Sequence, residues 1–376
     1  MQNNKLKIFI ISGEVSGDVL GARIMREMPN ADFVGIGGEN MIRAGLKSIF
    51  PMSDLAVMGA TEVLAHSRTL TRRIHQTVNA IICEQPDVVL TIDSPGFARS
   101  VIARLRKSAA GKKLISDGMR FHHVVAPQVW AWGPKRAKKY AKIFDKLYAF
   151  FDFEVPYFTK YGLDTIAVGH PISDGLVGAN YNGDNTKTIA IIPGSRMSEV
   201  TRLMPVFRDV VKSLHEKSRG YEFVIPVVET TREYIANAVM DWGVPVRLVN
   251  SDERYDVYKN AFVAIAASGT VSVELAMIHT PAIIVYRMNP ITIWLARRVI
   301  RIRWVSLVNI LLNRGVYPEL LGPDATTEKI LAEFDKLTRA PVRKKMVRGL
   351  SAADALWRKS NGAPAKLIAN DLMSVK

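Results

Sequence analysis

Short apolar runs alternate with longer amphipathic stretches along most of the chain. In the first half, the apolar runs predict strands at residues 5–11, 32–36, 87–92, 121–125, 146–149 and 165–168. The stretches between them, such as 16–28, 61–84 and 97–107, have the apolar spacing of helices that pack on one face. This alternation indicates parallel sheets covered by helices on both faces, so the predicted fold class is α/β.

A stretch rich in Gly, Pro and Asn interrupts the pattern at residues 169–188 and predicts a linker. After it the alternation restarts, with strands expected at residues 188–192, 222–227, 246–248, 262–266 and 282–286. We therefore predict two doubly wound Rossmann-like domains, 1–170 and 171–345. The helices of 346–376 are expected to pack on the first domain or on a partner chain. The carboxyl ends of both sheets should face a central cleft, where such folds bind ligands.

The composition is that of a globular protein, with 48% hydrophobic and 23% charged residues among 376. A single cysteine, Cys83, rules out disulfides within the chain and fits a reducing cytosol. No apolar run reaches the roughly 18 residues of a membrane span, and the first residues do not resemble a signal peptide. A cytoplasmic location is therefore expected.

The charge is strongly basic, because 51 Lys and Arg against 35 Asp and Glu give +16. Nucleic acid, an anionic membrane surface or a phosphorylated substrate would each suit that charge. The segment 293–305 interleaves apolar bulk with four arginines, Arg297, Arg298, Arg301 and Arg303. Such an element favours a lipid interface, with a core helix that has a solvated basic face as the alternative.

The strongest ligand-binding signal lies in residues 261–274. An apolar run ends at Ser268-Gly269-Thr270, and a helix is predicted to follow. Free amides at a helix N-terminus, at the positive end of its dipole, bind phosphate. Glu274 lies one turn further on the same face, where its carboxylate could accept hydrogen bonds from a ribose diol. A capped helix with a solvated acid is the alternative.

A second loop of this kind follows the first strand of the second half. Gly194 and Ser195 offer backbone amides, and Arg196 offers a guanidinium that matches phosphate oxygens. A capping box begun by Ser195 is the structural alternative. Together the two loops favour diphosphate binding.

Acidic side chains gather in two loops of the first half. Asp93 ends an apolar strand, so it should be partly desolvated, which would raise its pKa toward that of a general base. The alternative interpretation is that Asp93 caps the N-terminus of the following helix. Glu14, Ser16 and Asp18 follow the first strand; helix capping, by Ser16 above all, is the alternative to a ligand-binding role.

Cofactor and metal signals are weak. The loop at 12–18 lacks the G-x-G-x-x-G pattern of dinucleotide sites, and no G-x-x-x-x-G-K-[ST] loop occurs. His122, His123 and His170 lack zinc-ligand spacing, and no D-x-D or G-x-S-x-G motif is present. Neither a cofactor nor a metal is expected.

Seven motifs in sequence order resemble the lipid A disaccharide synthase family over essentially the whole chain. They are Ser12-Gly-Glu-Val-Ser-Gly-Asp18, Val57-Met-Gly59 with Glu62-Val-Leu64, Pro127-Gln-Val-Trp-Ala-Trp132, Val168-Gly-His-Pro171, Pro193-Gly-Ser-Arg196, Ala267-Ser-Gly-Thr270 with Glu274, and Tyr286-Arg-Met288. The resemblance implies the GT-B architecture and a peripheral enzyme of the cytoplasmic face of the Gram-negative inner membrane. It also implies transfer from UDP-2,3-diacylglucosamine to 2,3-diacylglucosamine 1-phosphate, giving a β-1,6 disaccharide 1-phosphate and UDP for lipopolysaccharide biosynthesis.

The resemblance also implies roles for individual residues. Asp93 would be the base for the acceptor 6-hydroxyl, and Glu14, Ser16 and Asp18 would line the acceptor side. The UDP site would contain Gly194, Ser195, Arg196, Ser268, Gly269, Thr270, Glu274, Arg287 and Asn309. Two positions depart from the family pattern: Gly96 stands where a second acid is expected, and Val308 where proline is usual.

Two other functions fit part of these observations. A UDP-sugar 2-epimerase has the same two-domain architecture but needs no acceptor and no membrane surface. A nucleic-acid-binding protein would suit the charge, yet the sequence lacks a recognition-helix motif or aromatic–basic ladders. Neither the acyl-chain preference nor the oligomeric state, for which a homodimer is one expectation, follows from the sequence.

Overall fold

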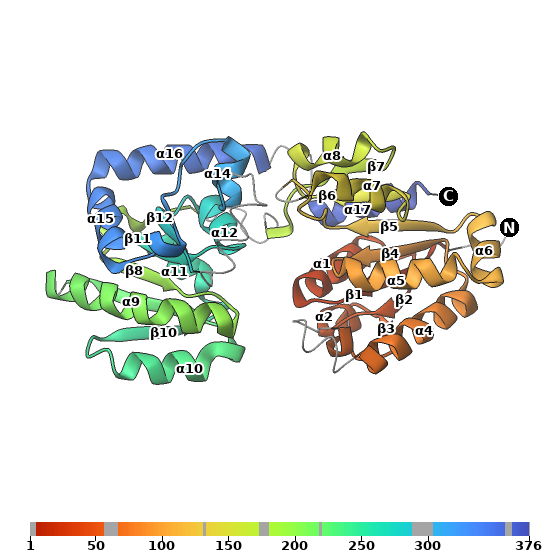
Figure 1. Ribbon diagram of the computed structural model, residues 1–376, viewed down its shortest axis with the longest axis horizontal. Coiled ribbons are helices and arrows are strands. Elements are labelled where there is room, and N and C mark those ends of the chain that lie inside the picture. The colour runs from red at the N-terminus through yellow and green to blue at the C-terminus, as the bar shows by residue number, and fades with distance from the viewer. Residues whose placement is uncertain are drawn as a thin grey trace. The chain divides into compact units, whose positions relative to one another are not determined.

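The computed structural model describes residues 5–55, 67–130, 133–172, 180–217, 220–287, 304–357 and 363–375 (Figure 1). The chain forms two compact units, Met1–Asp174 with Ser360–Lys376, and Gly175–Lys359. The predicted motifs at 57–64, most of the basic element at 293–305 and residues 173–179 of the predicted linker lie outside the described residues.

Unit 1 is built on one parallel sheet, in which seven strands are described, in the order β3-β2-β1-β4-β5-β6-β7. The strands are β1 (Lys7–Ser12), β2 (Asp32–Ile36), β3 (Lys47–Ser48), β4 (Val88–Ile92), β5 (Arg120–Val124), β6 (Lys146–Ala149) and β7 (Asp164–Ala167). The helices are α1 (Val15–Glu27), α2 (Glu39–Arg43), α4 (Ser67–Glu84), α5 (Pro95–Leu105), α6 (Ala109–Ser116), α7 (Ala137–Ala141), α8 (Val155–Thr159) and α17 (Pro364–Met373).

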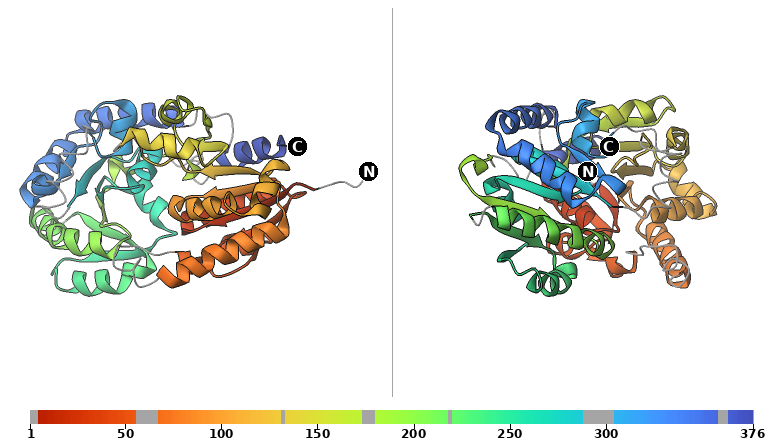
Figure 2. Two further views of the ribbon diagram at one scale, coloured as in Figure 1. Left: turned by 45° about the vertical axis from the view of Figure 1, so that its right-hand side comes forward. Right: turned by 60° about the vertical axis from the view of Figure 1, so that its left-hand side comes forward.

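Alternate side chains of the strands enter two separate cores. Phe9 and Ile11 of β1 pack with residues of α4 and α5, whereas Ile8 and Ile10 pack with residues of α1 and α17. Helices therefore cover both faces of this sheet, as the continuous apolar character of its strands predicts (Figure 2). The doubly wound α/β prediction is confirmed for this unit.

Unit 2 repeats the architecture. Its parallel sheet, counted over the described residues, has six strands in the order β10-β9-β8-β11-β12-β13. The strands are β8 (Thr188–Ile192), β9 (Glu222–Val227), β10 (Val246–Asn250), β11 (Val263–Ala267), β12 (Ala282–Tyr286) and β13 (Glu319–Leu321). The helices are α9 (Met197–Lys217), α10 (Glu229–Met240), α11 (Arg254–Asn260), α12 (Val271–Ile278), α14 (Leu307–Leu312), α15 (Thr327–Thr338) and α16 (Ala340–Trp357).

The C-terminal helices, expected from residue 346 onward to pack on the first domain or on a partner chain, divide between the two units. Helix α16 belongs to unit 2 and packs on α12, whereas α17 belongs to unit 1 and packs on α1. Asp371 of α17 accepts hydrogen bonds from Lys146 Nζ at 2.6 Å and from the Tyr148 hydroxyl at 2.7 Å, both on β6. These bonds anchor the last helix to the sheet of unit 1.

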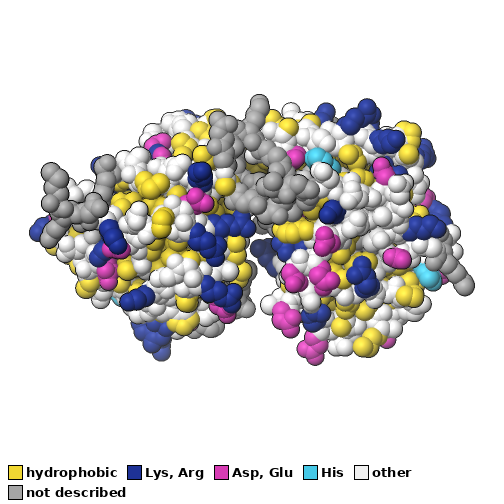
Figure 3. Space-filling model, turned by 180° about the vertical axis from the view of Figure 1, so that it is seen from behind, with side chains coloured by type: hydrophobic (Ala, Val, Ile, Leu, Met, Phe, Trp, Pro, Cys, Tyr) yellow, Lys and Arg dark blue, Asp and Glu magenta, His cyan; other side chains and the backbone are white. Residues whose placement is uncertain are grey.

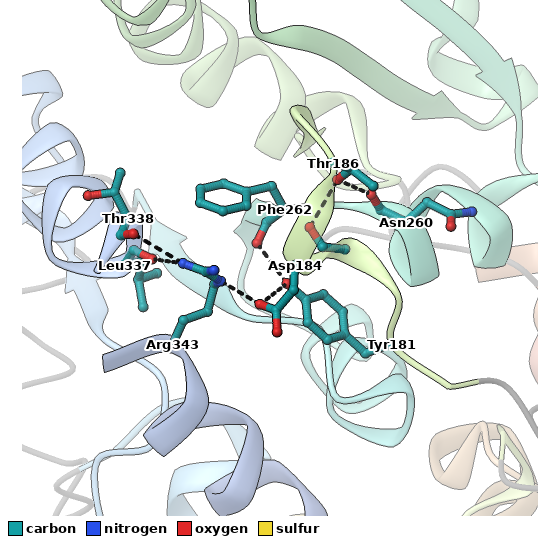
Figure 4. Close-up of polar contacts among 9 residues, drawn as sticks. Tyr181, Asp184, Thr186, Asn260, Phe262, Leu337, Thr338 and Arg343 are labelled. Carbon is teal, nitrogen blue, oxygen red and sulfur yellow. Dashed lines mark hydrogen bonds and ion pairs between the residues drawn. The ribbon is translucent and has the colours of Figure 1, made fainter. Parts of the chain in front are cut away.

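Arg343 of α16 fixes the first described residues of unit 2 (Figure 4). Its side chain is only 7% exposed, and its Nε donates to Asp184 Oδ1 at 2.8 Å. Its Nη1 donates to the Leu337 carbonyl at 2.9 Å, and the guanidinium lies 4.4 Å from the centre of the Phe262 ring. The Tyr181 hydroxyl donates to the Phe262 carbonyl. The segment that enters unit 2 is thereby held against α16 and β11.

Candidate functional site

The loops after β1 and β4 touch one another in unit 1. These two strands are neighbours, and the strand order runs outward from them in opposite directions. Such a point at the carboxyl edge of a parallel sheet is where doubly wound folds bind ligands. A Cβ at Gly13, after β1, would stand 2.1 Å from Ser94 Oγ, after β4. The glycine is what allows the two loops to lie so close.

Asp93 occupies this edge in an unusual backbone conformation. Asp93 and Ser94 have φ angles of 55° and 45°, in the left-handed region that few residues other than glycine adopt. Asp93 donates its backbone N–H to the Val124 carbonyl at 3.1 Å, and its Oδ1 accepts from the Ser94 N–H at 2.8 Å. Helix α5 has Ser94, not Asp93, as its N-cap residue. The half-buried carboxylate is thus held at the strand end rather than used as the cap.

A third strained residue lies at the same edge. Val125, directly after β5, has φ = 80°, which is uncommon for a β-branched side chain. Its N–H donates to the Tyr148 carbonyl at 3.1 Å, which continues the pairing toward β6. Backbone strain of this kind persists where the surrounding structure enforces it, often at functional sites. Asp93, Ser94 and Val125 all lie at the ends of two adjacent strands, which supports a functional role for this edge of the sheet.

The segment that follows β5 is tied to a buried acid. Trp130 Nε1 donates to Glu154 Oε1 at 3.2 Å, and the Phe151 N–H donates to Glu154 Oε2 at the same distance. Glu154 is only 4% exposed, and burial raises its pKa to about 7, although both donors act in the opposite direction. Trp130 belongs to one of the family motifs, but the sequence contained no signal for its partner.

The three polar residues after β1 have different surroundings. Glu14 and Ser16 are exposed. Helix α1 begins at Val15 with Glu14 at its N-cap position and no side-chain cap, so the prediction that Ser16 caps this helix is wrong.

Asp18 is 2% exposed, and its carboxylate accepts from the N–H groups of Gly38, Asn40 and Met41 at 2.7–3.1 Å. It stabilises the start of α2, where we had expected it to line an acceptor surface.

Unit 2 has the same kind of edge between β8 and β11. Gly194, in the loop after β8, has φ = 106°, and a Cβ there would stand 2.7 Å from Glu199 Oε2 and 3.6 Å from Ala267 Cβ at the end of β11. Ser195 and Arg196 are exposed, and Arg196 Nη1 lies 3.5 Å from Glu199 Oε1. The two predicted phosphate-type loops therefore start at adjacent points of one sheet.

The turn after β11 has backbone N–H groups that are available to a ligand. The Ser268 N–H donates to the Val285 carbonyl of β12 at 3.0 Å, so this amide is used within the sheet. In the described part of the chain, the amides of Gly269 and Thr270 have no hydrogen-bond partner, and both residues are exposed. Thr270 is the N-cap residue of α12 without a side-chain cap. The turn offers the anion-binding amides that its sequence predicts.

Glu274, one turn into α12, has two partners that the sequence did not indicate. Its Oε1 accepts from the Tyr255 hydroxyl at 3.2 Å and lies 3.4 Å from Arg254 Nε. The Arg254 guanidinium also packs over the Tyr255 ring, 4.1 Å from its centre. Burial raises the pKa of Glu274, whereas the Arg254 charge lowers it. The side chain is 13% exposed, and both contacts use the same oxygen.

Arg287 and Asn309 differ in their freedom to bind a ligand. Arg287 is exposed directly after β12. Asn309 is fully buried: its Oδ1 accepts from the N–H groups of Val316 and Tyr317, and its Nδ2 donates to the Tyr317 carbonyl and to Glu319 Oε1. An amide side chain makes four hydrogen bonds at most. Asn309 thus organises the turn before β13, and binding UDP would require it to exchange these bonds.

Lys and Arg side chains lie at many separate places on the face shown in Figure 3. This distribution differs from the continuous basic stripe of a nucleic-acid-binding surface. Among the helices of the described ranges, none is long and apolar enough to cross a membrane. The same ranges contain no group of three or more His, Cys, Asp or Glu side chains arranged to hold a metal ion.

Comparisons with known proteins give one consistent result. A family model described as lipid-A-disaccharide synthetase matches residues 8–363. The lipid-A-disaccharide synthase of Rhodospirillum centenum is 39% identical over 98% of this chain and 94% of its own, and that of Paramagnetospirillum magneticum is 37% identical over 93% and 90%.

Among solved structures, the UDP-GlcNAc 2-epimerase from Neisseria meningitidis bound to UDP-GlcNAc is similar, with a TM-score of 0.64 at 13% identity over 98% of this chain and 99% of that one. Identity this low shows a shared two-domain α/β fold and nothing further.

Proposed function

This chain belongs to the lipid-A-disaccharide synthase family, and from that premise we propose how its residues divide the family's reaction. It is a glycosyltransferase that uses a UDP-sugar donor and a sugar-phosphate acceptor. The proposed substrates are UDP-2,3-diacylglucosamine and 2,3-diacylglucosamine 1-phosphate, joined by a β-1,6 bond with release of UDP. The roles proposed for individual residues rest on one observation. The loops 193–196 and 268–270 follow neighbouring strands and lie close together at one edge of the unit 2 sheet.

Unit 2 is the proposed donor side. The amides of Gly194, Ser195, Gly269 and Thr270 would bind the diphosphate, and Arg196 would neutralise the charge that develops on the leaving UDP. Donors already in place before the reaction stabilise this charge without reorganisation. The open amides after β11 and the exposed guanidinium support this role.

Glu274 is the proposed ribose ligand. Arg254 and Tyr255 occupy its Oε1, which leaves Oε2 for a hydroxyl of the diol. Because Arg254 also favours the ionised form, the carboxylate would be an acceptor at neutral pH. Ser268 and Asn309 would act indirectly, by holding the turns beside the nucleotide, and exposed Arg287 would add a cation at the same edge.

Asp93 is the proposed general base. It would take the proton of the acceptor 6-hydroxyl as that oxygen attacks the anomeric carbon of the donor. The bond from this carbon to the diphosphate oxygen then breaks, and UDP leaves with the electron pair. A single displacement converts the α-linked donor into a β-linked product, so no covalent intermediate is needed. Exposed Glu14 and Ser16 lie one strand away and are proposed to contact the acceptor, with Asp18 holding the start of α2 in place.

The test is an assay of UDP release with each substrate alone and with both. Release that requires both substrates is the expected result; release from the donor alone would favour a hydrolase or an epimerase-like activity. The Asp93→Ala variant should lose turnover by several orders of magnitude and keep its affinity for UDP. Turnover close to that of the parent protein would overturn the choice of base.

Association with the membrane surface is a separate part of the proposal. The arginines at 297, 298, 301 and 303 give the chain a basic amphipathic segment suited to anionic lipid. Binding to vesicles that contain anionic lipid should weaken with salt and fall when these four are replaced by glutamine. Sedimentation at several concentrations would show whether the chain is a homodimer, which stays a prediction.

A further inference from the structure

The segment after β5 contains a family motif, 127–132, that has no role in the mechanism proposed above; its residues 127–130 are described. It leaves the sheet beside the proposed base, because the Asp93 N–H donates to the carbonyl of Val124, the last residue of β5. Val129 is completely buried, and its N–H closes a tight turn within the motif. Trp130 is half-buried. Trp130 therefore follows a buried anchor at the same edge of the sheet as Asp93.

Glu154 holds Trp130 from the loop after β6. Its Oε1 accepts from Trp130 Nε1 and its Oε2 from the Phe151 N–H, both at 3.2 Å. An indole N–H and a backbone N–H can only donate, so both oxygens of Glu154 must accept. The ionised carboxylate does this. A protonated acid or an amide would turn a donor of its own toward one of the two N–H groups, so the pair of bonds specifies a carboxylate.

Aromatic rings surround these two bonds. Phe153 meets the Trp130 ring edge to face, with the ring centres 5.5 Å apart, and stacks on Phe151 at 5.6 Å. Phe151 in turn lies 5.9 Å from His170, in the motif at 168–171. The cluster connects the segments that follow β5, β6 and β7 at the carboxyl edge of the sheet. Trp130 and Phe153 are both half-buried, so the indole is supported by the cluster and remains partly open to solvent.

A carboxylate is an unfavourable choice for a contact that serves stability alone. A buried charge is destabilising unless it is paired, and among the described residues no basic side chain pairs with Glu154. Burial accordingly raises the pKa of Glu154 to about 7. An apolar side chain would fill the same space without this cost, but it would leave the indole N–H without a partner. The two bonds therefore favour a role for Glu154 in setting where Trp130 lies.

We propose that Trp130 packs on the acceptor sugar and that Glu154 is the positioning residue that fixes the indole. The inference deepens the function proposed above and rests on it for the identity of the acceptor. The attacking hydroxyl is on C6, which is attached to the sugar ring, so a base at Asp93 places that ring at this edge of the sheet. The faces of the ring present apolar C–H groups, which suit an aromatic side chain. The acyl chains start at C2 and C3, across the ring from C6, so the ring itself is what lies near the base.

Transfer assays test the role of each side chain. Trp130→Leu should raise KM for the phosphorylated diacylglucosamine acceptor about tenfold, the effect of losing one aromatic contact. Glu154→Gln should raise it about fivefold, because glutamine can accept from only one of the two N–H groups. The affinity for UDP should stay at the parent value in both variants. Asp152→Asn is the matched control, since Asp152 is exposed in the same turn, Asp152–Glu154, and it should change neither quantity.

A double-mutant cycle tests whether Glu154 acts through Trp130. Trp130→Phe keeps an aromatic ring but removes the indole N–H, and glutamine at 154 can then satisfy the one remaining donor, the Phe151 N–H. Glu154→Gln should therefore have little further effect on KM in the Trp130→Phe background. Additive increases in KM would overturn the positioning role, because a merely structural role for Glu154 predicts them.

The pH dependence of KM is a second readout. Below its pKa Glu154 is protonated and one of its two bonds is lost, so the parent KM for the acceptor should rise as pH falls from 8 to 6. Glu154→Gln should lack this contribution. His170 of the same cluster stays neutral over this range, since burial lowers its pKa to about 4, and Asp93 is common to both proteins. Equal KM values for parent and variant at pH 8 would overturn the positioning role.

Indole NMR signals separate this inference from the proposed function. The Trp130 Nε1–H signal is the one that disappears in Trp130→Phe. Titration with the phosphorylated diacylglucosamine acceptor in detergent, without donor, should shift this signal, and such a shift supports the inference even if no transfer occurs. An acceptor that shifts the backbone signals around Asp93 but not the Trp130 signal overturns the inference even if transfer is confirmed.

Discussion

Gly13 and Ser94 lie in direct contact although 81 positions separate them, and a Cβ on Gly13 would stand 2.1 Å from Ser94 Oγ and 2.9 Å from Ser94 Cβ. The contact joins the loops that follow two neighbouring strands of the unit 1 sheet. Because Ser94 is adjacent to Asp93 in a strained segment, Gly13 helps to set where the Asp93 carboxylate lies. The proposed base is therefore positioned in part by a residue with no side chain.

Gly13→Ala should reduce transfer by about tenfold or more, since the new methyl group must displace the 93–94 segment. Affinity for UDP, measured by calorimetry on the same variant, should stay at the parent value. The double variant Gly13→Ala/Ser94→Gly removes the obstructing side chain at a position where glycine suits the backbone, and it should restore most of the activity. Additive losses in the double variant would contradict the steric explanation.

Gly194→Ala should weaken UDP binding about tenfold, because alanine disfavours the φ of 106° and its methyl group would contact Glu199. The loop would then carry its amides away from the diphosphate. Gly118→Ala is the control, since Gly118 has a similar φ of 112° and open space around it. That variant should lose stability without losing affinity. A parent-like Kd for Gly194→Ala, measured by titration calorimetry, would argue against this loop as a diphosphate ligand.

Glu154→Gln should change how stability depends on pH. Burial raises the pKa of Glu154 to about 7 from its ordinary 4.5, so between these values the folded protein binds more protons than the unfolded one. Its free energy of unfolding therefore falls as pH rises through this window. A neutral glutamine avoids this loss, and relative to the parent the variant should gain on the order of 2 kcal/mol between pH 5 and pH 8.

Urea unfolding of both proteins at pH 5, 6.5 and 8 measures this difference. His122, His123 and His170, whose pKa values burial lowers, are common to both proteins, so their contributions cancel. Parallel pH profiles for parent and variant would show that Glu154 is already ionised throughout the range.

Asp371→Ala should destabilise unit 1 by about 1–3 kcal/mol, because it removes an acceptor from the buried Tyr148 hydroxyl and one of the two carboxylates that contact Lys146. Asp164→Ala is the matched control, since Asp164 lies 3.0 Å from the same Lys146 Nζ but its side chain is 60% exposed. An exposed ion pair contributes at most about 1 kcal/mol, so this control should lose less. Equal shifts of the urea midpoint would mean that α17 is not held by Asp371.

The sequence by itself determined the fold class and the locations of the phosphate-type loops. Apolar runs of five or six residues that alternate with amphipathic stretches predict strands whose two faces are both covered by helices, as in a parallel sheet. Three strands were predicted at their observed bounds: Thr188–Ile192, Glu222–Val227 and Ala282–Tyr286. Local rules also place Gly194 and Gly269 in the turns that follow strands, because a glycine just after an apolar run is a short-range signal.

Tertiary structure alone decided which of these side chains remain available for chemistry. Asp18 and Asn309 have the polarity of ligand-binding residues, yet distant backbone amides occupy both. The partners that matter at the two edges, Ser94 for Gly13 and Arg254 for Glu274, share no sequence period that would pair them. The order of the strands brings these residues together, and burial and the neighbouring charge then set the pKa of Glu274. Hydrogen bonding between residues far apart in sequence depends on that packing, which no local pattern encodes.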